Sequence, residues 1–241
     1  MASVSVEALR QDGLTLGPAT DVIASSTLQR LRDTVAKYRG QLLAERRARL
    51  DDPRAAKDYV VRLLGPRPVF TPTSAWATVA LDPGLVALAR AYLPRPGYLE
   101  AYNVWYSYPT TAAPSHSQLW HQDKDDEAIV KVFLYLSDVT PETGALTYIP
   151  GSAVRHGQTY RPAASQDSIG AWRTSDDDMA ACVPRSAWRD ASGPAGTLLI
   201  ADTTGWHKGG HVLRDERLVF TCMYTMGKTR NYFADGRKIP L

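Results

Sequence analysis

The stretch Lys131-Val-Phe-Leu-Tyr-Leu-Ser-Asp-Val139 has the alternation of a half-buried β-strand, and the same pattern extends back to residue 128. Successive side chains of a strand point to opposite faces, so this run carries two different surfaces. They are an aliphatic set of Val130, Val132, Leu134 and Leu136, and a mixed set of Lys131, Phe133 and Tyr135. We expect the aliphatic set to pack in a core between two sheets or under helices, and the mixed set to form a pocket wall.

Short β-rich runs separated by turn signals continue on both sides of this stretch. Thr140-Pro-Glu-Thr-Gly144 predicts one turn, and Pro150-Gly151-Ser152 ends another strand. The expected strands are 98–108, 117–123, 128–138, 145–149, 196–202, 206–212 and 217–226. Such a series indicates a mainly β fold with α-helices, built on a double-stranded β-helix (a jelly-roll, cupin-like core).

The first 96 residues have a mainly helical pattern and are expected to pack on one sheet. A run of apolar residues at helical spacing follows Ser25-Ser26, which can cap the helix start, and Gly40 weakens this helix. Asp52-Pro53 and Asp82-Pro83 each fit an N-cap followed by proline at the first helical position. The first of these helices would end near Gly65-Pro66 and the second near Pro94.

One domain spanning 1–241 is the simplest organisation for a chain of this length. It would comprise a helical front (1–96), the β core (97–228) and a C-terminal tail (229–241). Within the core, residues from about 155 to 195 have weak periodicity and several Asp, Ser, Pro and Gly residues. A loop of this length is uncommon unless it is functional, so we expect a lid over the active site.

Composition excludes several classes of protein. The hydrophobic content of 44% and charged content of 22% are those of a soluble globular protein. A net charge of +3 is too small to indicate nucleic-acid binding, and the run Arg46-Arg47 with Arg49 fits the solvated face of a helix. We therefore expect a small-molecule substrate as partner, and neither nucleic acid nor membrane; the sequence carries no signal for an oligomeric state.

The two cysteines and the N-terminus favour a cytoplasmic location. Cys182 and Cys222 could form at most one disulfide, and the apolar strand around Cys222 indicates a buried thiol. Residues 1–13 lack the apolar core of a signal peptide, and no stretch approaches the length of a membrane span.

Two histidines and one aspartate predict a metal site. His121 and Asp123 are two residues apart on the expected strand 117–123, so both would point to the same face and could bind one ion. With His207 from a later strand they provide two imidazoles and one carboxylate, the facial triad of non-haem Fe(II) oxygenases. His211 is the alternative to His207, and His116 lies in a polar, proline-flanked stretch that we expect to be a loop.

Five motifs in the same order resemble the phytanoyl-CoA dioxygenase (PhyH) family. They are Leu-Trp-His-Gln-Asp (119–123), Lys-Val-Phe-Leu-Tyr-Leu-Ser-Asp-Val (131–139), Gly-Ala-Leu-Thr-Tyr-Ile-Pro-Gly-Ser (144–152), Gly-Thr-Leu-Leu-Ile-Ala-Asp-Thr (196–203) and His-Lys-Gly-Gly-His (207–211). The resemblance covers roughly 98–226. It implies an enzyme that uses Fe(II), 2-oxoglutarate and O2, with His121, Asp123 and His207 both as metal ligands and as the catalytic centre.

The resemblance also implies that Arg217 binds the distal carboxylate of 2-oxoglutarate. A guanidinium presents a planar fork that matches a carboxylate, and Arg217 opens an apolar strand where a buried cation needs a counter-charge. Arg214 is the alternative, although it lies in a polar turn. Relatives with the same His-Gln-Asp use the glutamine near the co-substrate, so Gln122 is a second candidate contact, with Tyr135 and Asn103 as further ones.

Contacts to the substrate are less specific in the sequence. Lys131 on the mixed face could bind a carboxylate of the substrate or co-substrate, or could equally be a lysine at the rim of its strand. Trp120 and Tyr102 belong to a group of aromatic residues near the site. Core packing explains most of that group, and we take these two as candidates for the cavity wall.

Two details bear on the reaction. Relatives commonly have Pro-Gly-Ser-His, whereas Ala153 follows Ser152 here, and the next basic residues are Arg155 and His156. Related halogenases replace the ligand carboxylate with a small residue, so Asp123 favours hydroxylation or another oxidation without halide.

We therefore predict an Fe(II)- and 2-oxoglutarate-dependent dioxygenase that hydroxylates or otherwise oxidises an unactivated C–H bond of a small organic molecule. Succinate and CO2 would be released, and natural-product tailoring is the expected context. Two alternatives stay open at this point. One is a cupin-like metalloenzyme that does not use 2-oxoglutarate, and the other is a non-enzymatic jelly-roll sensor.

Overall fold

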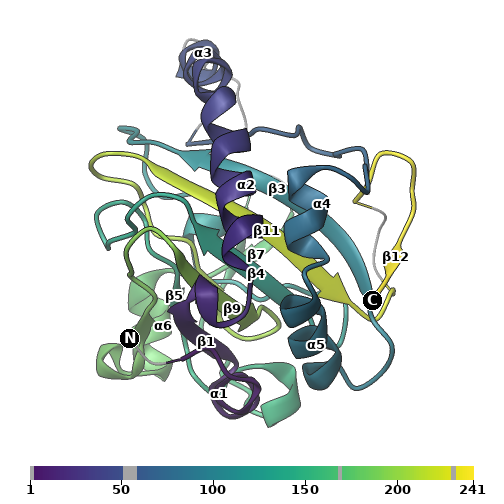
Figure 1. Ribbon diagram of the computed structural model, residues 1–241. Helices are drawn as coiled ribbons and strands as arrows, with labels where there is room; N and C mark the ends of the chain where they lie inside the picture. Colours follow the sequence, from purple (N-terminus) through teal and green to yellow (C-terminus); the bar gives the residue numbers. More distant parts are fainter. Residues whose placement is uncertain (1–2, 51–58, 168–169, 229–231) are drawn as a thin grey trace.

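An antiparallel sheet forms the centre of the computed structural model, which describes residues 3–50, 59–167, 170–228 and 232–241. Its strands are ordered β1–β9–β4–β11–β3–β12, and β2 also pairs with β3 (Figure 1). The bounds are β1 Leu14–Pro18, β2 Val60–Arg62, β3 Tyr98–Ser107, β4 Val130–Tyr135, β9 Thr197–Asp202, β11 Arg217–Thr225 and β12 Ile239–Pro240.

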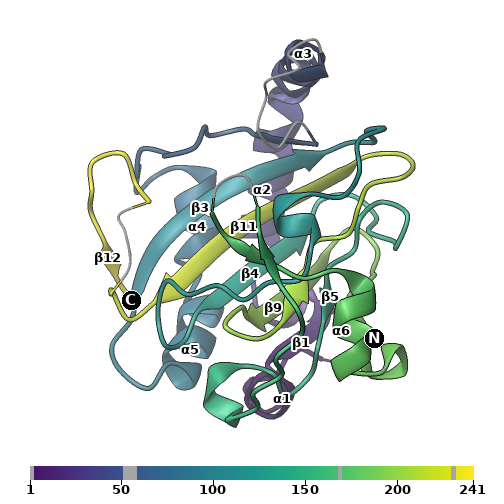
Figure 2. The ribbon, with the colours of Figure 1, turned by 180° about the vertical axis from the view of Figure 1, so that it is seen from behind.

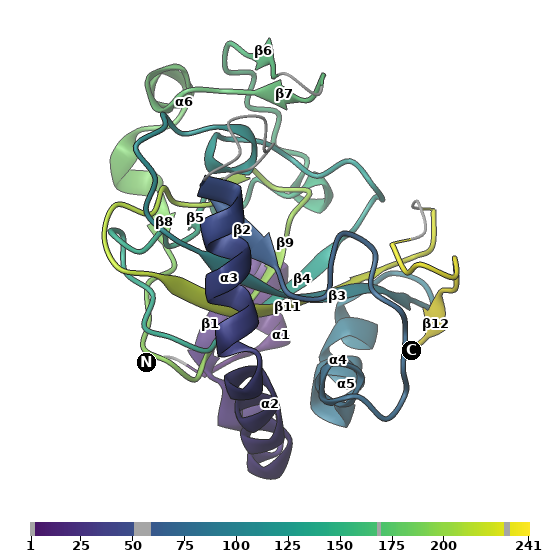
Figure 3. The same cartoon turned by 90° about the horizontal axis from the view of Figure 1, so that it is seen from above.

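Helices cover one face of this sheet. Figure 3 shows α2, α4 and α5 together on one side, while α6 and the β6–β7 hairpin lie on the other. The bounds are α1 Val6–Asp12, α2 Ser25–Lys37, α3 Arg39–Leu50, α4 Ala75–Ala80 and α5 Pro83–Tyr92. Val130, Val132 and Leu134 are buried in one cluster with the helical residues Leu28, Leu31 and Leu85. The aliphatic face of the 128–138 run is therefore the face under the helices.

The opposite face of the sheet carries the smaller elements (Figure 2). A second sheet has the order β10–β5–β8, and β6 pairs with β7. The bounds are β5 Thr147–Tyr148, β6 Ser165–Gln166, β7 Trp172–Arg173, α6 Asp176–Cys182, β8 Arg189–Asp190 and β10 His207–Lys208, with short 3-10 turns at Ala19–Asp21, His116–Gln118, Val154–His156 and Arg185–Ala187. Tyr135, Leu199 and Val219 of the large sheet meet Tyr148 of the small one, and Leu146 just before β5, in a second buried cluster.

Most of the predicted strands are confirmed, with one error and two shortenings. Strands occupy 98–107, 130–135, 197–202 and 217–225, close to the predicted ranges. The predicted strand 117–123 is wrong, because a 3-10 turn occupies His116–Gln118 and only isolated bridges follow. The strands predicted at 145–149 and 206–212 are only two residues long each.

The helical front matches its prediction in part. Asp82 is the N-cap of α5, where its Oδ1 accepts from Gly84 N at 3.0 Å. The helix after residue 24 also forms, but Ala24 is its N-cap and no side chain caps it. The predicted start at Asp52-Pro53 lies outside the described residues, and β2 occupies part of the range expected to be helical.

The first 96 residues also contribute strands to the large sheet. β1 pairs with β9 along its whole length, from Leu14 opposite Ala201 to Pro18 opposite Thr197. The expected lid, about 155–195, holds α6 and several two-residue strands, so it is not structureless. Of the helices in the described ranges, none is long and apolar enough to cross a membrane.

Candidate active site

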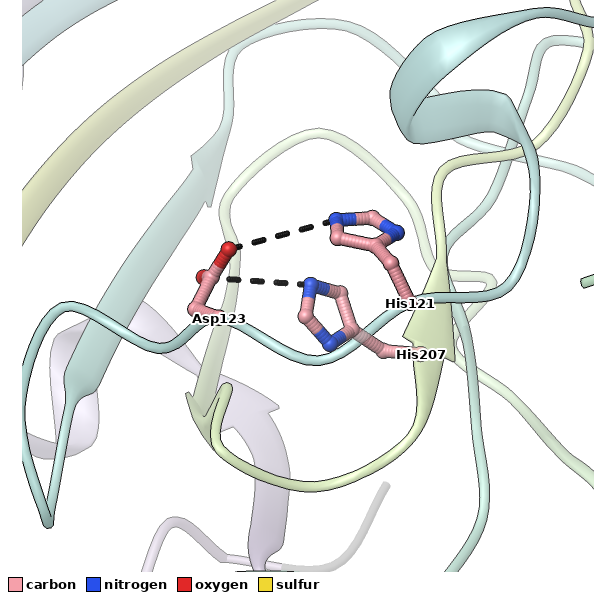
Figure 4. Close-up of side chains that lie close together, drawn as sticks. All are labelled: His121, Asp123 and His207. Atoms are coloured by element: carbon pink, nitrogen blue, oxygen red, sulfur yellow. Dashed lines mark ion pairs between the residues drawn. The ribbon is translucent and has the colours of Figure 1, made fainter. Parts of the chain in front are cut away.

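The three predicted ligands lie together on the face of the large sheet away from the helices. One potential ligand atom from each of His121, Asp123 and His207 lies within 4.8 Å of the other two (Figure 4). The Nε2 atom of His121 is 4.0 Å from Asp123 Oδ1, and that of His207 is 3.9 Å from Oδ2. Two imidazole nitrogens and one carboxylate oxygen therefore converge on one point, as a three-ligand metal site requires.

A backbone pair, and not a regular strand, sets the position of the two histidines. His121 N donates to His207 O at 2.9 Å, and His207 N donates to His121 O at 3.0 Å. Asp123 N bonds elsewhere, to Thr203 O at 2.8 Å. The predicted convergence of His121 and Asp123 is thus present, although the extended strand expected to produce it is not.

Backbone carbonyls orient both imidazole rings. His121 Nδ1 donates to Leu119 O at 2.8 Å, and His207 Nδ1 donates to Gly205 O at 2.9 Å. With the proton on Nδ1, each Nε2 presents its lone pair toward Asp123. Burial lowers the pKa of both histidines, and for His121 the neighbouring His207 lowers it further. Both rings are therefore neutral at pH 7, the form that binds a metal.

The tight turn 202–205 contacts Gln122 and Asp123 of the His-Gln-Asp motif and the distal His207. Thr203 O accepts from Asp123 N, and Gly205 O accepts from His207 Nδ1. Asp202, which is fully buried, holds the turn by accepting from Thr204 N and Oγ1 at 3.0 and 2.8 Å. A Cβ at Gly205 would lie 2.1 Å from the hydroxyl of Tyr148, so only glycine fits there.

Lys131 contacts the ligand carboxylate directly. Its Nζ lies 2.5 Å from Asp123 Oδ2. Burial alone would raise the pKa of Asp123, but the Lys131 ammonium lowers it well below its usual range. Asp123 is therefore an anion, with one oxygen held by Lys131 and the other directed at His121.

A cavity of about 200 Å³ adjoins the metal ligands. It is larger than the roughly 150 Å³ of an engineered cavity that binds benzene, so it has room for a small organic molecule. Phe133 and Tyr135 from the mixed face of β4 line it with Lys131, which confirms the predicted pocket wall. Arg217 lines it from β11.

Arg217 projects into this cavity without a carboxylate partner in the described part of the chain. Its Nη1 donates to Gly144 O and its Nη2 to Ser107 Oγ at 3.3 Å, while its Nε has no partner. Burial lowers its pKa, and interactions with Tyr135 and Tyr59 oppose that shift. A guanidinium in this position is suited to an incoming carboxylate. Arg214 is exposed and lies 3.8 Å from Glu142, so it faces away from the cavity.

Of the other predicted co-substrate contacts, Tyr135 and Asn103 line the cavity and Gln122 does not. Tyr135 lines the cavity, but its hydroxyl donates to Ala191 O at 2.6 Å. Asn103 lines it too, while its side chain holds the backbone at residues 64–65. Gln122 is not among the cavity-lining residues, and its Nε2 donates to Thr204 O at 2.7 Å. Gln122 therefore contacts the turn 202–205 and not the cavity.

The two aromatic candidates for substrate binding have their polar groups directed elsewhere. Trp120 is fully buried outside the cavity lining and packs against Trp188 with ring centroids 4.8 Å apart. Tyr102 borders the cavity, but its ring packs on Phe70 and Phe233 and its hydroxyl donates to Val69 O.

The other two histidines near the motifs lie outside the ligand group. His211 does not belong to the cluster of potential ligand atoms. His116 is buried with a left-handed backbone (φ 50°), and its Nδ1 lies 3.2 Å from Asp167 Oδ2. His116 thus fastens the segment that follows Ser165.

Sequence reasoning missed a side-chain clamp behind the two histidines. Asp176, the first residue of α6, accepts from Trp120 Nε1 at 2.8 Å and from Lys208 Nζ at 2.6 and 2.7 Å. Trp120 precedes His121 and Lys208 follows His207. One carboxylate from the predicted lid therefore ties together the two segments that carry the imidazoles. The only sequence signal was the Ser175-Asp176 helix start.

The phytanoyl-CoA dioxygenase (PhyH) family profile matches residues 9–215, which is most of the chain. The chain belongs to this family. The three candidate metal ligands of the chain, His121, Asp123 and His207, lie in the motifs 119–123 and 207–211. The chain has no significant match among curated proteins.

Solved structures similar to this PhyH-family chain share its fold at low sequence identity. EctD from S. alaskensis with bound Fe is 18% identical with a TM-score of 0.61, covering 97% of this chain and 79% of that one. The epimerase SnoN, in complex with Fe3+, alpha ketoglutarate and nogalamycin RO, is 19% identical with a TM-score of 0.57, covering 96% and 86%. AviO1 from Streptomyces viridochromogenes Tue57 is 17% identical with a TM-score of 0.53, covering 95% and 98%.

Ser152, Arg155 and His156, which lie where relatives commonly have Pro-Gly-Ser-His, each make a defined contact in this family member. Ser152 Oγ accepts from Trp206 N at 2.8 Å and so supports the residue before His207. Arg155 lies over the ring of Tyr92, 4.4 Å from its centroid. His156 Nε2 donates to Arg10 O at 2.7 Å. Neither basic residue lines the cavity.

Proposed function

We propose that this chain is an Fe(II)- and 2-oxoglutarate-dependent oxygenase that hydroxylates or otherwise oxidises an unactivated C–H bond of a small organic molecule. One observation carries the proposal. Potential ligand atoms of His121, Asp123 and His207 converge beside a cavity that Arg217 also lines. The Arg217 guanidinium has no carboxylate partner among the described residues. We further propose that the two sheets form a double-stranded β-helix within a single domain spanning 1–241.

In this proposal the metal is held by the Nε2 atoms of both histidines and one Asp123 oxygen. The donor set fits Fe(II), because two imidazoles and one carboxylate leave positions open for further ligands. When bound, iron supplies the redox chemistry that activates O2. The protein keeps the imidazoles neutral by burial and keeps Asp123 ionised with the Lys131 ammonium.

Arg217 would receive the distal carboxylate of 2-oxoglutarate. Gly144 O and Ser107 Oγ hold the two terminal nitrogens of the guanidinium and so fix its plane at the cavity wall. A charge-assisted hydrogen bond of this kind is about twice as strong as a neutral one. Tyr135 and Asn103 would shape the cavity around the co-substrate, whereas Gln122 would support the ligand-bearing turn.

The segment of about 155–195 would act as the lid of the active site. Its residue Asp167 lies 3.2 Å from the His116 ring and accepts from Arg173 Nε at 3.1 Å. Its helix α6 is held to both histidine segments through Asp176. These contacts support the proposal that the segment covers the candidate metal ligands, where it would exclude water from the reaction.

Natural-product tailoring is the context that we favour. The SnoN and SnoK structures are described as an epimerase and a carbocyclase from nogalamycin biosynthesis, and both resemble this chain in fold. Hydroxylation is our proposed outcome, because the Asp123 carboxylate occupies the place that a halide would need.

The deciding experiment requires no substrate. 2-Oxoglutarate is added to the anaerobic Fe(II)-loaded protein, and the weak visible charge-transfer band of the iron chelate is recorded. We expect a band in the native protein and in Arg214→Ala, a weaker band in Arg217→Ala, and none in His207→Ala. A protein that binds iron but gives no band would support the 2-oxoglutarate-independent enzyme or the non-enzymatic sensor.

A further inference from the structure

The cavity beside the metal ligands is strongly cationic. Three basic side chains line it, namely Arg62, Lys131 and Arg217, and no aspartate or glutamate is among its lining residues in the described part of the chain. A concave site with one sign of charge concentrates ligands of the opposite sign. The charge of the cavity therefore favours an anion beyond what the metal ligands require.

Two of these cations already have partners or roles. Lys131 is paired with Asp123, and Arg217 is assigned to the co-substrate. The side chain of Arg62 makes no hydrogen bond or ion pair with any residue that the structure describes. Glu45 borders a neighbouring hollow together with Arg62, but its carboxylate accepts from Gln41 Nε2 at 2.8 Å. Among the described residues, Arg62 is thus the cation of the cavity wall whose side chain has no partner and no assigned role.

The pairing of the strands places Arg62 well away from Arg217. Arg62 is directly opposite Trp105, and Trp105 is opposite Val219, so these side chains share the cavity face of the sheet. Arg217 lies in the next row, opposite Ser107. Two interstrand spacings and about two residues along the strand separate the Cα atoms of the two arginines, roughly 12 Å by standard sheet geometry. The two arginines therefore start from different rows and different strands of the sheet.

Arg62 lies in surroundings that disfavour an unpaired charge. Burial lowers its pKa, and Arg49 lowers it further by repulsion. Leaving a partly buried guanidinium without an acceptor is unfavourable, and an anionic ligand group would remove that cost.

Apolar side chains line the cavity beside Arg62. Trp105 is directly opposite it on β3, and Pro66 and Pro68, which also line the cavity, follow it in the chain. Aromatic and proline side chains of this kind bind hydrocarbon or aromatic groups, whereas the few polar groups of a pocket fix the orientation of its ligand. One end of the cavity therefore combines a hydrophobic surface with a single cation.

We infer that the substrate is a small organic acid whose carboxylate binds Arg62 and whose apolar body lies against Trp105 and its neighbours. This inference rests on the proposed function, since it assigns the substrate class of the same site. It also makes Arg62 a specificity-determining residue, distinct from the co-substrate residue Arg217.

Matched pairs of ligands test this inference. The probes are 3-phenylpropanoate with 3-phenylpropanamide, indole-3-acetate with indole-3-acetamide, and decanoate with decanamide. Binding is measured by thermal shift in the metal-free protein and in the anaerobic complex with Fe(II) and 2-oxoglutarate. We expect at least one acid to bind ten times more tightly than its amide in the native protein and in Arg47→Met, which removes an exposed arginine of α3. Arg62→Met should abolish the preference, and Arg62→Lys should retain part of it.

Three results would overturn the inference: amides that bind as tightly as their acids, an acid preference that persists in Arg62→Met, or no acid binder in the panel. Measurement in the metal-free protein separates this inference from the proposed function. An acid preference that depends on Arg62, found together with no charge-transfer band, would retain the anion site and reject the 2-oxoglutarate chemistry.

Discussion

His121 and His207 are joined by two reciprocal backbone hydrogen bonds, and their ring centroids lie 4.2 Å apart. Each ring is also fixed by a carbonyl two residues before it in the chain. The backbone therefore places the two candidate ligands, and this pairing does not depend on their imidazole side chains.

Replacing either histidine should remove the metal without unfolding the protein. We expect His121→Ala and His207→Ala to retain native circular dichroism, because the backbone pair remains, and to lose stoichiometric Fe(II) binding. Metal content after anaerobic loading and gel filtration measures the effect. Full iron occupancy in either variant would rule out that residue as a ligand.

Arg217→Ala should raise the requirement for 2-oxoglutarate and leave iron binding unchanged. Losing charge-assisted hydrogen bonds to a carboxylate weakens binding by roughly ten- to a hundredfold. Titration of the charge-transfer band with 2-oxoglutarate gives the dissociation constant. Arg214→Ala removes an exposed arginine nearby and should bind the co-substrate normally; the reverse result would assign the co-substrate to Arg214.

The large sheet was predictable because its signal is local. In Val130–Tyr135 the apolar and mixed positions alternate with the period of a strand, and the two faces separate as that period requires. β1 was not predicted, since Leu14–Pro18 contains Gly17 and ends in proline and its partner β9 lies about 180 residues later in the chain. Nothing local indicates such a pairing.

The site was predicted at the level of residues more successfully than at the level of geometry. His121 and Asp123 converge, but not through a regular strand: His121 is held by its backbone pair with His207, and Asp123 by the turn at 202–205. The polar contacts of Gln122 and Asp176 depend on where distant segments lie, so spacing alone could not give them. The same holds for the role of Lys131, which could be placed on the correct face but not beside Asp123.

Lys131→Met should weaken Fe(II) binding. Lys131 holds Oδ2 of Asp123 and leaves Oδ1 directed at His121. Loss of such an outer contact typically reduces metal affinity by roughly ten- to a hundredfold, and we expect a decrease of that size here. Competition with a coloured chelator gives the affinity. Lys124→Met, which removes an exposed lysine next to the motif, is the control. Tighter iron binding in Lys131→Met would mean that the ammonium competes with the metal.

Asp176→Ala should loosen both histidine segments. It removes the acceptor shared by Trp120 Nε1 and Lys208 Nζ, which we expect to cost about 1–2 kcal/mol of unfolding free energy and to weaken iron binding at the same time. Asp177→Ala is a matched control, since it removes another acid from the same first turn of α6, but its side chain is 96% exposed and pairs only with Arg185 among the described residues. Equal effects of the two substitutions would attribute the result to the helix terminus and not to the clamp.

The metal-free protein should lose stability as the pH falls below about 6.5. Burial lowers the pKa of His121 and His207 from the ordinary value of 6.5, so below that pH the unfolded chain binds protons that the folded chain does not. Stability then decreases with falling pH, by at most about 1.4 kcal/mol per pH unit for each histidine. Urea unfolding of the chelator-treated protein at pH 8, 7, 6 and 5.5 measures the slope. The double variant His121→Gln/His207→Gln should have a shallower slope over the same range, and an unchanged slope would show that these two rings do not carry the pH dependence.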